Sequence, residues 1–483
     1  MSLSLITLFM KNPLSSMFAA AKTVKKFMKN YWKIILVLAI IIPSLGVSLA
    51  FFWMSQQPNP PVGIVNLTLS PQYATESPAS DIFVLNGAGV AHINNLIGLM
   101  GSQGLHFYQS STLSTTQGPS GLIGPNDVVL IKINSQWDCR GGTNTDLLRE
   151  LIQAVLDHPD SFSGEVVVAD NGQGVGSLNW GENNGEDPNQ SVQDVVTSFA
   201  LSYDVSLFDW QTIRGIQVNE YSEGDMQDGY ILNITADTET RIYVSYPKFQ
   251  SEDGTYISFK HGIWNGTGYE ARLKVINFPI LKSHGNYGVT GAVKHYMGVQ
   301  SEGQAVQGGL ANGHYSIARG GMGTLLAQTQ FPVLNILDAI WVNANPYPSP
   351  HCGPPTGYDE ATRVNLLMAS TDPVALDYWA AKYVLMQTSA IIGYEDTHVL
   401  NPDNTERSGL REAFGIWLNL SRDELIQNGF TVTTNLAQMN VYISQMDNTL
   451  TDTLPSKLCA ISYVDLNNGI IPNHLRKCNL VAV

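Results

Sequence analysis

Apolar runs with the length of buried β-strands recur along the chain, and helical patterns lie between them. Residues 128–134 form the strongest run, and residues 165–172 form a second run that ends in an acid and a turn. Between these two runs, apolar residues recur at helical spacing as far as Leu156, and Thr145 is placed to cap this helix. Strand, helix and strand in this order predict a βαβ unit, and therefore a parallel sheet with a right-handed crossover.

Further patterns extend this unit on both sides. Residues 81–85 predict the strand at which the folded part begins, and residues 90–101 carry apolar residues at helical spacing. Residues 173–190 are rich in Gly and Asn and predict a loop over a site, and a helix is expected over 191–202. Residues 210–273 alternate apolar and polar positions and turn often at Gly and Asp. This pattern predicts an insertion of antiparallel hairpins that extends the edge of the sheet.

Cationic residues follow directly after the apolar run 275–281, which has the length of a buried strand. Lys282 and His284 come where this strand would end, a glycine-rich turn follows, and Lys294 comes next. Buried cations need partners, so these residues are costly as core. At the carboxyl end of a strand they can hold an anion, and the glycines let the backbone approach it. The alternative is a solvated loop with surface lysines.

Two more strand patterns follow towards the C-terminus. Residues 331–340 predict a strand with Asp338 near its end, and residues 366–370 predict another strand before a helix. Asp372 precedes Pro373 at the start of this helix, which indicates a helix N-cap in preference to a catalytic acid.

The N-terminal part of the chain predicts a membrane anchor. Ile34 to Met54 is a run of 21 residues without a charge, which is long enough to cross a bilayer. Residues 1–33 contain six lysines and no acid, so the positive-inside rule places them in the cytoplasm and the main domain outside. A signal peptide cleaved near residues 48–50 is the alternative, but the long basic region favours an uncleaved signal anchor. Residues 55–80 are rich in Pro, Ser, Gln and Asn and predict an extracellular linker.

Cysteines and glycosylation sequons agree with an exterior domain. The four cysteines, Cys139, Cys352, Cys459 and Cys478, allow three pairings. The last two are close in sequence near the C-terminus, and pairing them leaves Cys139 with Cys352. No C-x-x-C run is present, which disfavours an iron–sulfur cluster. Asn-x-Ser/Thr sequons occur, all after the predicted span, at Asn66, Asn189, Asn233, Asn265 and Asn419.

The distribution of charge argues against a nucleic-acid partner. The formal net charge is −15, from 26 basic and 41 acidic residues. Six of the basic residues lie in residues 1–33, so the rest of the chain has 20 basic and 41 acidic residues. A nucleic-acid-binding domain needs a basic face, which this strongly acidic balance does not provide.

The segment after residue 278 resembles the signature of the domain of unknown function 362 (DUF362) family. Members carry a strand that ends in a proline, then Lys-x-His, a Thr-Gly-x-x-Lys helix start and a Met-Gly pair. The corresponding residues here are Pro279, Lys282-Ser283-His284, Thr290-Gly291-Ala292-Val293-Lys294 and Met297-Gly298. The chain departs at His295, where the family usually has Asn. The resemblance implies a fold and a site but no established reaction.

The resemblance extends over about residues 128–386. Relatives show a strand that ends in Lys-x-Asn, a later strand that ends in Asp, and a Ser-x-Asp-Pro-Val-Ala-x-Asp motif that corresponds here to residues 370–377. Some relatives carry ferredoxin-like cysteines, which this chain lacks, so electron transfer is not implied. We therefore expect an α/β domain over 81–400 and a C-terminal extension over 401–483. The expected fold is a mixed, mainly parallel sheet flanked by helices, with the antiparallel insertion and one transmembrane helix.

Strands that lie side by side in a parallel sheet bring their carboxyl ends to one edge, where ligands bind in open α/β folds. We expect Lys282, His284 and Asp170 to be catalytic, with a proton moved by His284 or by a lysine of lowered pKa. The expected ligand-binding residues are Lys132, Asn134, Asn171, Lys294 and Asp338. Lys294, at the start of a glycine-preceded helix, would act together with the N–H groups of that helix.

A divalent metal is a second use of the same groups, because imidazole and carboxylate ligands are available. The candidate ligands are His284, Asp170, Asp338 and His351, although no recognised metal-binding spacing is present.

Two hypotheses of function follow. The first is a membrane-anchored, outward-facing protein with a pocket for a small carboxylate or phosphate, and with acid–base or metal-assisted chemistry. The second is a non-catalytic surface module for binding or adhesion on an enzyme-like fold, in which the same charged groups neutralise one another. Retention of the Lys-x-His and Thr-Gly-x-x-Lys residues favours the pocket.

Overall fold

The chain divides after Asn59 into two units, and the fold described below is that of the second unit, Pro60–Val483. The computed structural model describes, within the second unit, residues 64–88, 92–137, 140–172, 177–187, 189–301, 313–346, 361–394, 396–406 and 413–446. The predicted span from Ile34 to Met54, all four cysteines and His351 lie outside the described residues. No helix in the described ranges is both long enough and apolar enough to cross a bilayer.

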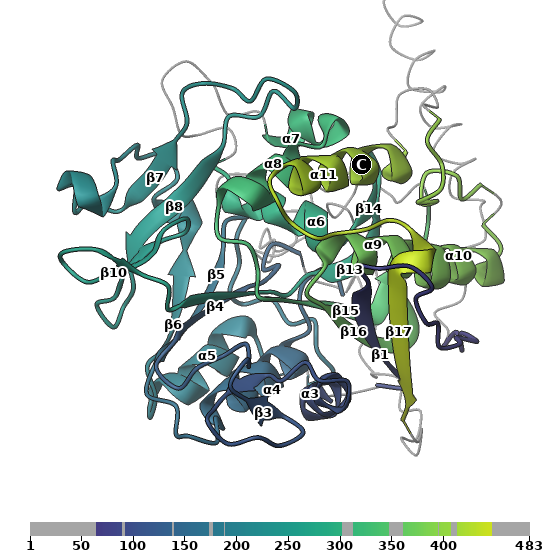
Figure 1. Ribbon diagram of the computed structural model, residues 1–483, viewed down its shortest axis with the longest axis horizontal. Helices are drawn as coiled ribbons and strands as arrows, with labels where there is room; N and C mark the ends of the chain where they lie inside the picture. Colours follow the sequence, from purple (N-terminus) through teal and green to yellow (C-terminus); the bar gives the residue numbers. More distant parts are fainter. Residues whose placement is uncertain are drawn as a thin grey trace, which may run out of the picture. The chain divides into compact units, whose positions relative to one another are not determined.

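A ten-stranded sheet, parallel except at β14 and β16, forms the framework of the second unit (Figure 1). Its main path has the order β17-β1-β16-β15-β12-β4-β5-β6, and the hairpin β13–β14 is attached through β15. The strands are β1 (Ser80–Asn86), β4 (Val128–Lys132), β5 (Glu165–Asp170), β6 (Val205–Asp209), β12 (Leu273–Asn277), β13 (Ile280–His284), β14 (Gly288–Thr290), β15 (Leu334–Asn343), β16 (Ala361–Ser370) and β17 (Met439–Gln445).

Helices cover both faces of this sheet and enclose a separate apolar core on each (Figure 1). One face packs against α3 (Ile93–Ser102), α4 (Thr145–Leu156) and α5 (Val192–Ala200). The other packs against α6 (Ala292–His295), α8 (Gly321–Gln328), α9 (Pro373–Ala380) and α11 (Phe414–Gln427). Shorter elements are α7 (Gly313–Ser316), α10 (Met386–Ile392), the π-helical turn η5 (Ala381–Leu385), and the 3₁₀ turns η1 (Trp210–Thr212), η2 (Tyr221–Glu223), η3 (Tyr296–Val299), η4 (Ile317–Arg319) and η6 (Leu436–Gln438). The expected mixed, largely parallel α/β fold is confirmed.

The predicted βαβ unit is confirmed as β4, α4 and β5, with β4 and β5 parallel and in register. Its cap differs from the prediction. Asn144, rather than Thr145, is the N-cap of α4, because its side-chain oxygen accepts from the N–H groups of Asp146 and Leu147. The helix therefore begins at Thr145, one residue earlier than the predicted cap requires.

The apolar run 275–281 forms two strands instead of the single strand that its length predicts. Pro279 has no N–H group, so it cannot continue the ladder of β12. At this break the Phe278 N–H donates to the Lys132 carbonyl, and the Asp338 N–H donates to the Pro279 carbonyl. Beyond it, β13 pairs with β15 and turns into β14. Lys282 therefore lies inside a second buried strand and not after the end of the first one.

The predicted insertion forms an antiparallel sheet of its own, so it does not extend the edge of the main sheet. Its order is β11-β10-β9-β8-β7. The strands are β7 (Gly229–Leu232), β8 (Ser245–Gln250), β9 (Tyr256–Ser258), β10 (Gly262–Trp264) and β11 (Tyr269–Glu270), and a separate two-stranded sheet consists of β2 (Tyr108–Gln109) and β3 (Gln117–Gly118).

The described part of the C-terminal segment is built into the main sheet. β17 pairs in parallel with β1 along its full length, and α11 packs against α8. Asp372 is the N-cap of α9, as predicted, and accepts from the N–H groups of Val374 and Ala375. Its second oxygen accepts from Ser80 and from the Thr433 N–H, so this carboxylate also ties β1 and the C-terminal segment to the helix.

Candidate active site

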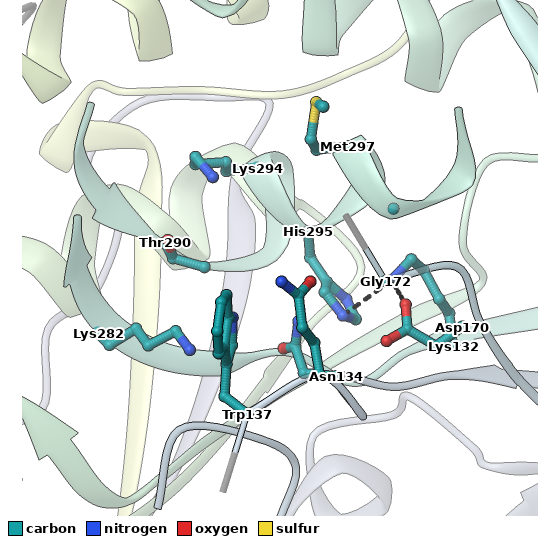
Figure 2. A pocket seen from close by; sticks show the side chains of 12 residues that line it. Lys132, Asn134, Trp137, Asp170, Gly172, Lys282, Thr290, Lys294, His295 and Met297 are labelled. Carbon is teal, nitrogen blue, oxygen red and sulfur yellow. Dashed lines mark hydrogen bonds and ion pairs between the residues drawn. The ribbon is translucent and has the colours of Figure 1, made fainter. Parts of the chain in front are cut away.

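A cavity lies where β4 and β5 end, beneath α6 and η3 and beside the hairpin β13–β14 (Figure 2). The space inside it that water-sized groups can occupy is about 50 Å³. Its lining residues are Lys132, Asn134, Gln136, Trp137, Asp170, Gly172, Lys282, Thr290, Lys294, His295, Met297 and Gly298. Five of the eight side chains predicted for the site are among them, namely Lys132, Asn134, Asp170, Lys282 and Lys294.

Lys132, the last residue of β4, is fully buried and hydrogen-bonded. Its Nζ lies 3.2 Å from Asp170 Oδ1, 3.0 Å from His295 Nε2 and 3.2 Å from the Ile133 carbonyl oxygen. The other carboxylate oxygen of Asp170 accepts from the Ser135 N–H at 2.9 Å. Burial lowers the pKa of Lys132, and the ion pair with Asp170 opposes this effect. The two residues thus form a neutralised pair on one wall of the cavity.

A chain of side-chain amides sets the tautomer of His295. The Asn277 amide nitrogen donates to the Ala292 carbonyl at 2.9 Å and to Asn335 Oδ1 at 2.8 Å. Asn277 Oδ1 therefore faces His295 Nδ1 at 2.7 Å, and Nδ1 must carry the proton. His295 Nε2 is then the acceptor of an N–H from Lys132. Burial, and then the charge of Lys132, lower the pKa of His295 well below its usual range, so the ring is neutral.

Lys282 reaches the cavity from β13, with its Nζ pointing toward Trp137 and Asn134 in Figure 2. Its side chain is buried, and Nζ donates to the Gly141 carbonyl oxygen. Burial, and then the ammonium of Lys294, lower the pKa of Lys282 to about 7, with a smaller opposing effect of Asp170. An amine of this kind can hold or release a proton near neutral pH.

Lys294 and His295 are carried by the short helix α6, which another helix holds in place. Asp377 of α9 accepts from the Ala292 N–H at 2.6 Å and from the Val293 N–H at 2.9 Å. The expectation that the N–H groups of this helix start bind the anion is therefore wrong, because a protein carboxylate already accepts from two of them. Gly291 permits this contact, since a Cβ there would lie 2.3 Å from Asp377 Oδ1.

Gly298 allows the polypeptide to pass directly over the ion pair. A Cβ at this position would lie 2.7 Å from Lys132 Nζ and 3.2 Å from Asp170 Oδ1. The close contact explains why glycine stands at this position of the Met-Gly pair: a side chain here would displace the charged groups of the cavity.

Three predicted site residues do not line the cavity. Asp338 lies in the middle of β15, where it accepts from the Asn144 N–H at 3.2 Å and the Ile340 N–H at 3.0 Å, and burial raises its pKa to about 6. His284 Nδ1 accepts from the N–H groups of the hairpin turn, at Asn286 and Tyr287.

The third is Asn171, which donates to the Gln300 carbonyl oxygen at 2.6 Å. These three side chains hold backbone in place at strand or turn positions. The metal-ligand set predicted from Asp170, Asp338 and His284 is correspondingly dispersed. Across the described residues, no three His, Cys, Asp or Glu side chains gather closely enough to hold a metal ion.

The remaining lining residues were not predicted for the site, although Thr290, His295, Met297 and Gly298 lie in the segment that resembles the family signature. His295 is the most consequential of them, because it connects Lys132 to the amide chain of Asn277. The sequence offered one signal for it, since His295 stands where the family usually has Asn. Trp137 and Gln136 lie in an irregular loop after β4, where no periodicity points into a site.

Four of the predicted glycosylation acceptors, Asn66, Asn189, Asn233 and Asn265, are exposed. Asn419 differs, because it lies half-buried in α11 and its amide nitrogen donates to the Gly415 carbonyl at 2.7 Å. Modification there would break this hydrogen bond.

Comparison with known proteins adds one finding. A family model described as "Domain of unknown function (DUF362)" matches residues 129–382, which include every residue that lines the cavity. No curated protein and no solved structure matches the chain.

Proposed function

Because the chain belongs to the DUF362 family, whose description assigns no activity, its function has to be inferred from the cavity: we propose that this cavity binds a small anion with a carboxylate or phosphate group. One observation carries the proposal. Lys132, Lys282 and Lys294 all line the cavity, with exposed fractions of 0%, 1% and 4%, and Asp170 is the one acid among the described lining residues.

This imbalance of charge favours an anionic ligand. Lys132 and Asp170 neutralise each other within the cavity. The Gly141 carbonyl, to which Lys282 donates, carries no full charge, and Lys282 and Lys294 repel one another. Burying the Lys282 ammonium against a neutral acceptor and beside a second cation is costly, and a bound anion would reduce this cost. The non-catalytic alternative expects the charged groups to neutralise one another. Lys132 and Asp170 do so, but Lys282 donates to a neutral carbonyl.

The same cavity suits acid–base chemistry. A general acid or base works best when its pKa is close to the ambient pH, and the pKa of Lys282 is about 7. The neutral ring of His295 keeps its Nε2 bound to Lys132, so it positions that lysine. We assign proton transfer to Lys282, anion binding to Lys294, and positioning to the group formed by Lys132, Asp170 and His295.

We further propose that this site faces the exterior of the cell. The support is the uncharged run from Ile34 to Met54 after a lysine-rich segment, which is typical of a signal anchor. The exposed sequons on the main domain agree with this orientation.

Calorimetric titration of the purified full chain with phosphate and acetate tests the anion site. We expect binding that weakens at least about tenfold in Lys294→Met and Lys282→Met, because truncating one partner of a buried charge pair costs about 2–5 kcal/mol. Lys260→Met is the matched control, since Lys260 is exposed and lies outside the cavity. Equal affinity in all four proteins would refute the proposal. Titrations with Mg²⁺ and Zn²⁺ would show whether a metal contributes.

A further inference from the structure

The lysines of the cavity differ in how their amines are used. Lys132 Nζ has three acceptors in Asp170, His295 and the Ile133 carbonyl, which occupy all three N–H bonds of an ammonium group. Within the described parts of the chain, Lys282 Nζ donates to one backbone carbonyl, that of Gly141. Lys132 is therefore held as a structural cation, whereas Lys282 lines the cavity with fewer hydrogen-bond acceptors around its amine.

The surroundings of Lys282 also favour an uncharged amine. The side chain is 1% exposed, Trp137 lines the cavity beside it, and the second cation, Lys294, lies on the neighbouring helix α6. Desolvation and a cationic neighbour are the two conditions that activate a lysine as a nucleophile. Asp170 opposes both effects, but its oxygens are bonded to Lys132 and Ser135.

We propose that Lys282 forms an imine with the carbonyl group of a small oxo acid, meaning a ketone or aldehyde that also carries a carboxylate or phosphate. This inference rests on the proposed anion site, because Lys294 would hold the charged end of the molecule while Lys282 attacks its carbonyl carbon. It adds to that function a covalent step and a defined substrate class.

The step balances without an oxidant, a reductant or a metal. The amine lone pair of Lys282 forms a bond to the carbonyl carbon, and the C=O π electrons move to the oxygen. A proton passes from nitrogen to this oxygen to give a carbinolamine. The C–O bond then breaks, a second proton follows to the leaving oxygen, and water departs as the C=N bond forms. Hydrolysis reverses the sequence and restores the amine.

The acidity of Lys282 supports this assignment. With a pKa of about 7, roughly half of the Lys282 side chains are free amines at pH 7. An ordinary lysine with a pKa near 10.4 has roughly one free amine in 2,500 at that pH. Lys282 would therefore react with carbonyl compounds near neutral pH far faster than the exposed lysines.

Reductive trapping tests the inference on the full chain. The protein is incubated at pH 7 with pyruvate or dihydroxyacetone phosphate and with cyanoborohydride, which reduces an imine to a stable amine, and the modified peptide is located by mass spectrometry. We expect the adduct on Lys282, with a labelling rate that rises with pH and levels off above about pH 7. The two probes distinguish a carboxylate from a phosphate as the anionic group. Acetone, a carbonyl compound without a charge, should label at least about tenfold less.

Variants and a second measurement separate this inference from the proposed function. Lys282→Arg keeps the positive charge but has no amine for an imine and should lose the adduct, whereas the exposed-site control Lys260→Arg should keep it. Mapping the adduct in the wild-type chain needs no variant and is unaffected if Lys282→Arg folds poorly.

Binding of lactate, an anion without a ketone or aldehyde group, is measured in parallel by calorimetry. Equal labelling of exposed lysines and Lys282, with lactate still bound, would overturn the imine and leave the anion site standing. If the wild-type chain binds neither lactate nor phosphate, the imine and the anion site are both overturned.

Discussion

Replacing Lys282 by Met should change how the stability of the protein depends on pH. Lys282 is buried, with its pKa lowered from 10.5 to about 7 in the folded chain. Below pH 7 the lysine is protonated in both the folded and the unfolded chain, and above pH 10.5 it is neutral in both. Between these values the unfolded chain binds one more proton, so the free energy of unfolding rises with pH. Met cannot titrate, so its variant lacks this contribution.

The expected size follows from the width of this window. One pKa unit corresponds to about 1.4 kcal/mol, so the free energy of unfolding of the wild type, relative to Lys282→Met, should rise by about 1.4 kcal/mol per pH unit. Between pH 7 and pH 9 the rise is about 3 kcal/mol. Below pH 7 the difference in the free energy of unfolding between the two proteins should be constant. Lys282→Met should be most stable relative to the wild type in this range, because an apolar side chain then replaces a buried ammonium.

Urea unfolding followed by tryptophan fluorescence, from pH 6 to pH 9, measures this difference. Urea is preferred to guanidinium because it is uncharged and does not screen the repulsion between Lys282 and Lys294. Lys260→Met is the control and should track the wild type at every pH, because Lys260 is exposed. A difference between the wild type and Lys282→Met that does not change with pH would refute the lowered pKa, and with it the role of Lys282 as a base or nucleophile near pH 7.

Two further substitutions test how the site is held. Asp377→Ala removes the acceptor of two buried N–H groups at the start of α6 and should lower the free energy of unfolding by about 2–6 kcal/mol, with weaker anion binding by calorimetry. Asp377→Asn keeps one acceptor and should cost less, and equal stability of Ala, Asn and wild type would contradict the cap. Gly298→Ala should cost about 1–3 kcal/mol in urea unfolding, because its Cβ would overlap Lys132 Nζ. Gly285→Ala, with no atom within 4 Å of its Cβ, is the neutral control, and an equal effect of both would contradict the close contact.

Local pattern was sufficient for the framework of the fold. The apolar run at 128–134, the helical spacing after Thr145 and the run at 165–172 predicted β4, α4 and β5, because burial on both faces of a parallel strand leaves a continuous apolar signature. The acid before Pro373 likewise identified a helix cap, since capping depends on residues adjacent in sequence. The sequence also placed Lys132 and Asp170 at the ends of neighbouring strands, where they meet.

Only the tertiary structure decided which charged groups face the cavity and which hold the backbone. Asp338 and Asp170 look alike in sequence, as acids that follow apolar runs, but Asp338 is in mid-strand and accepts from backbone N–H groups. Asp377 lies 85 residues from the N–H group that it caps, a distance at which no local pattern connects them. The low pKa of Lys282 similarly arises from burial and from Lys294 on another element. Sequence determines local conformation, whereas desolvation and charge–charge distance exist only once distant segments are packed together.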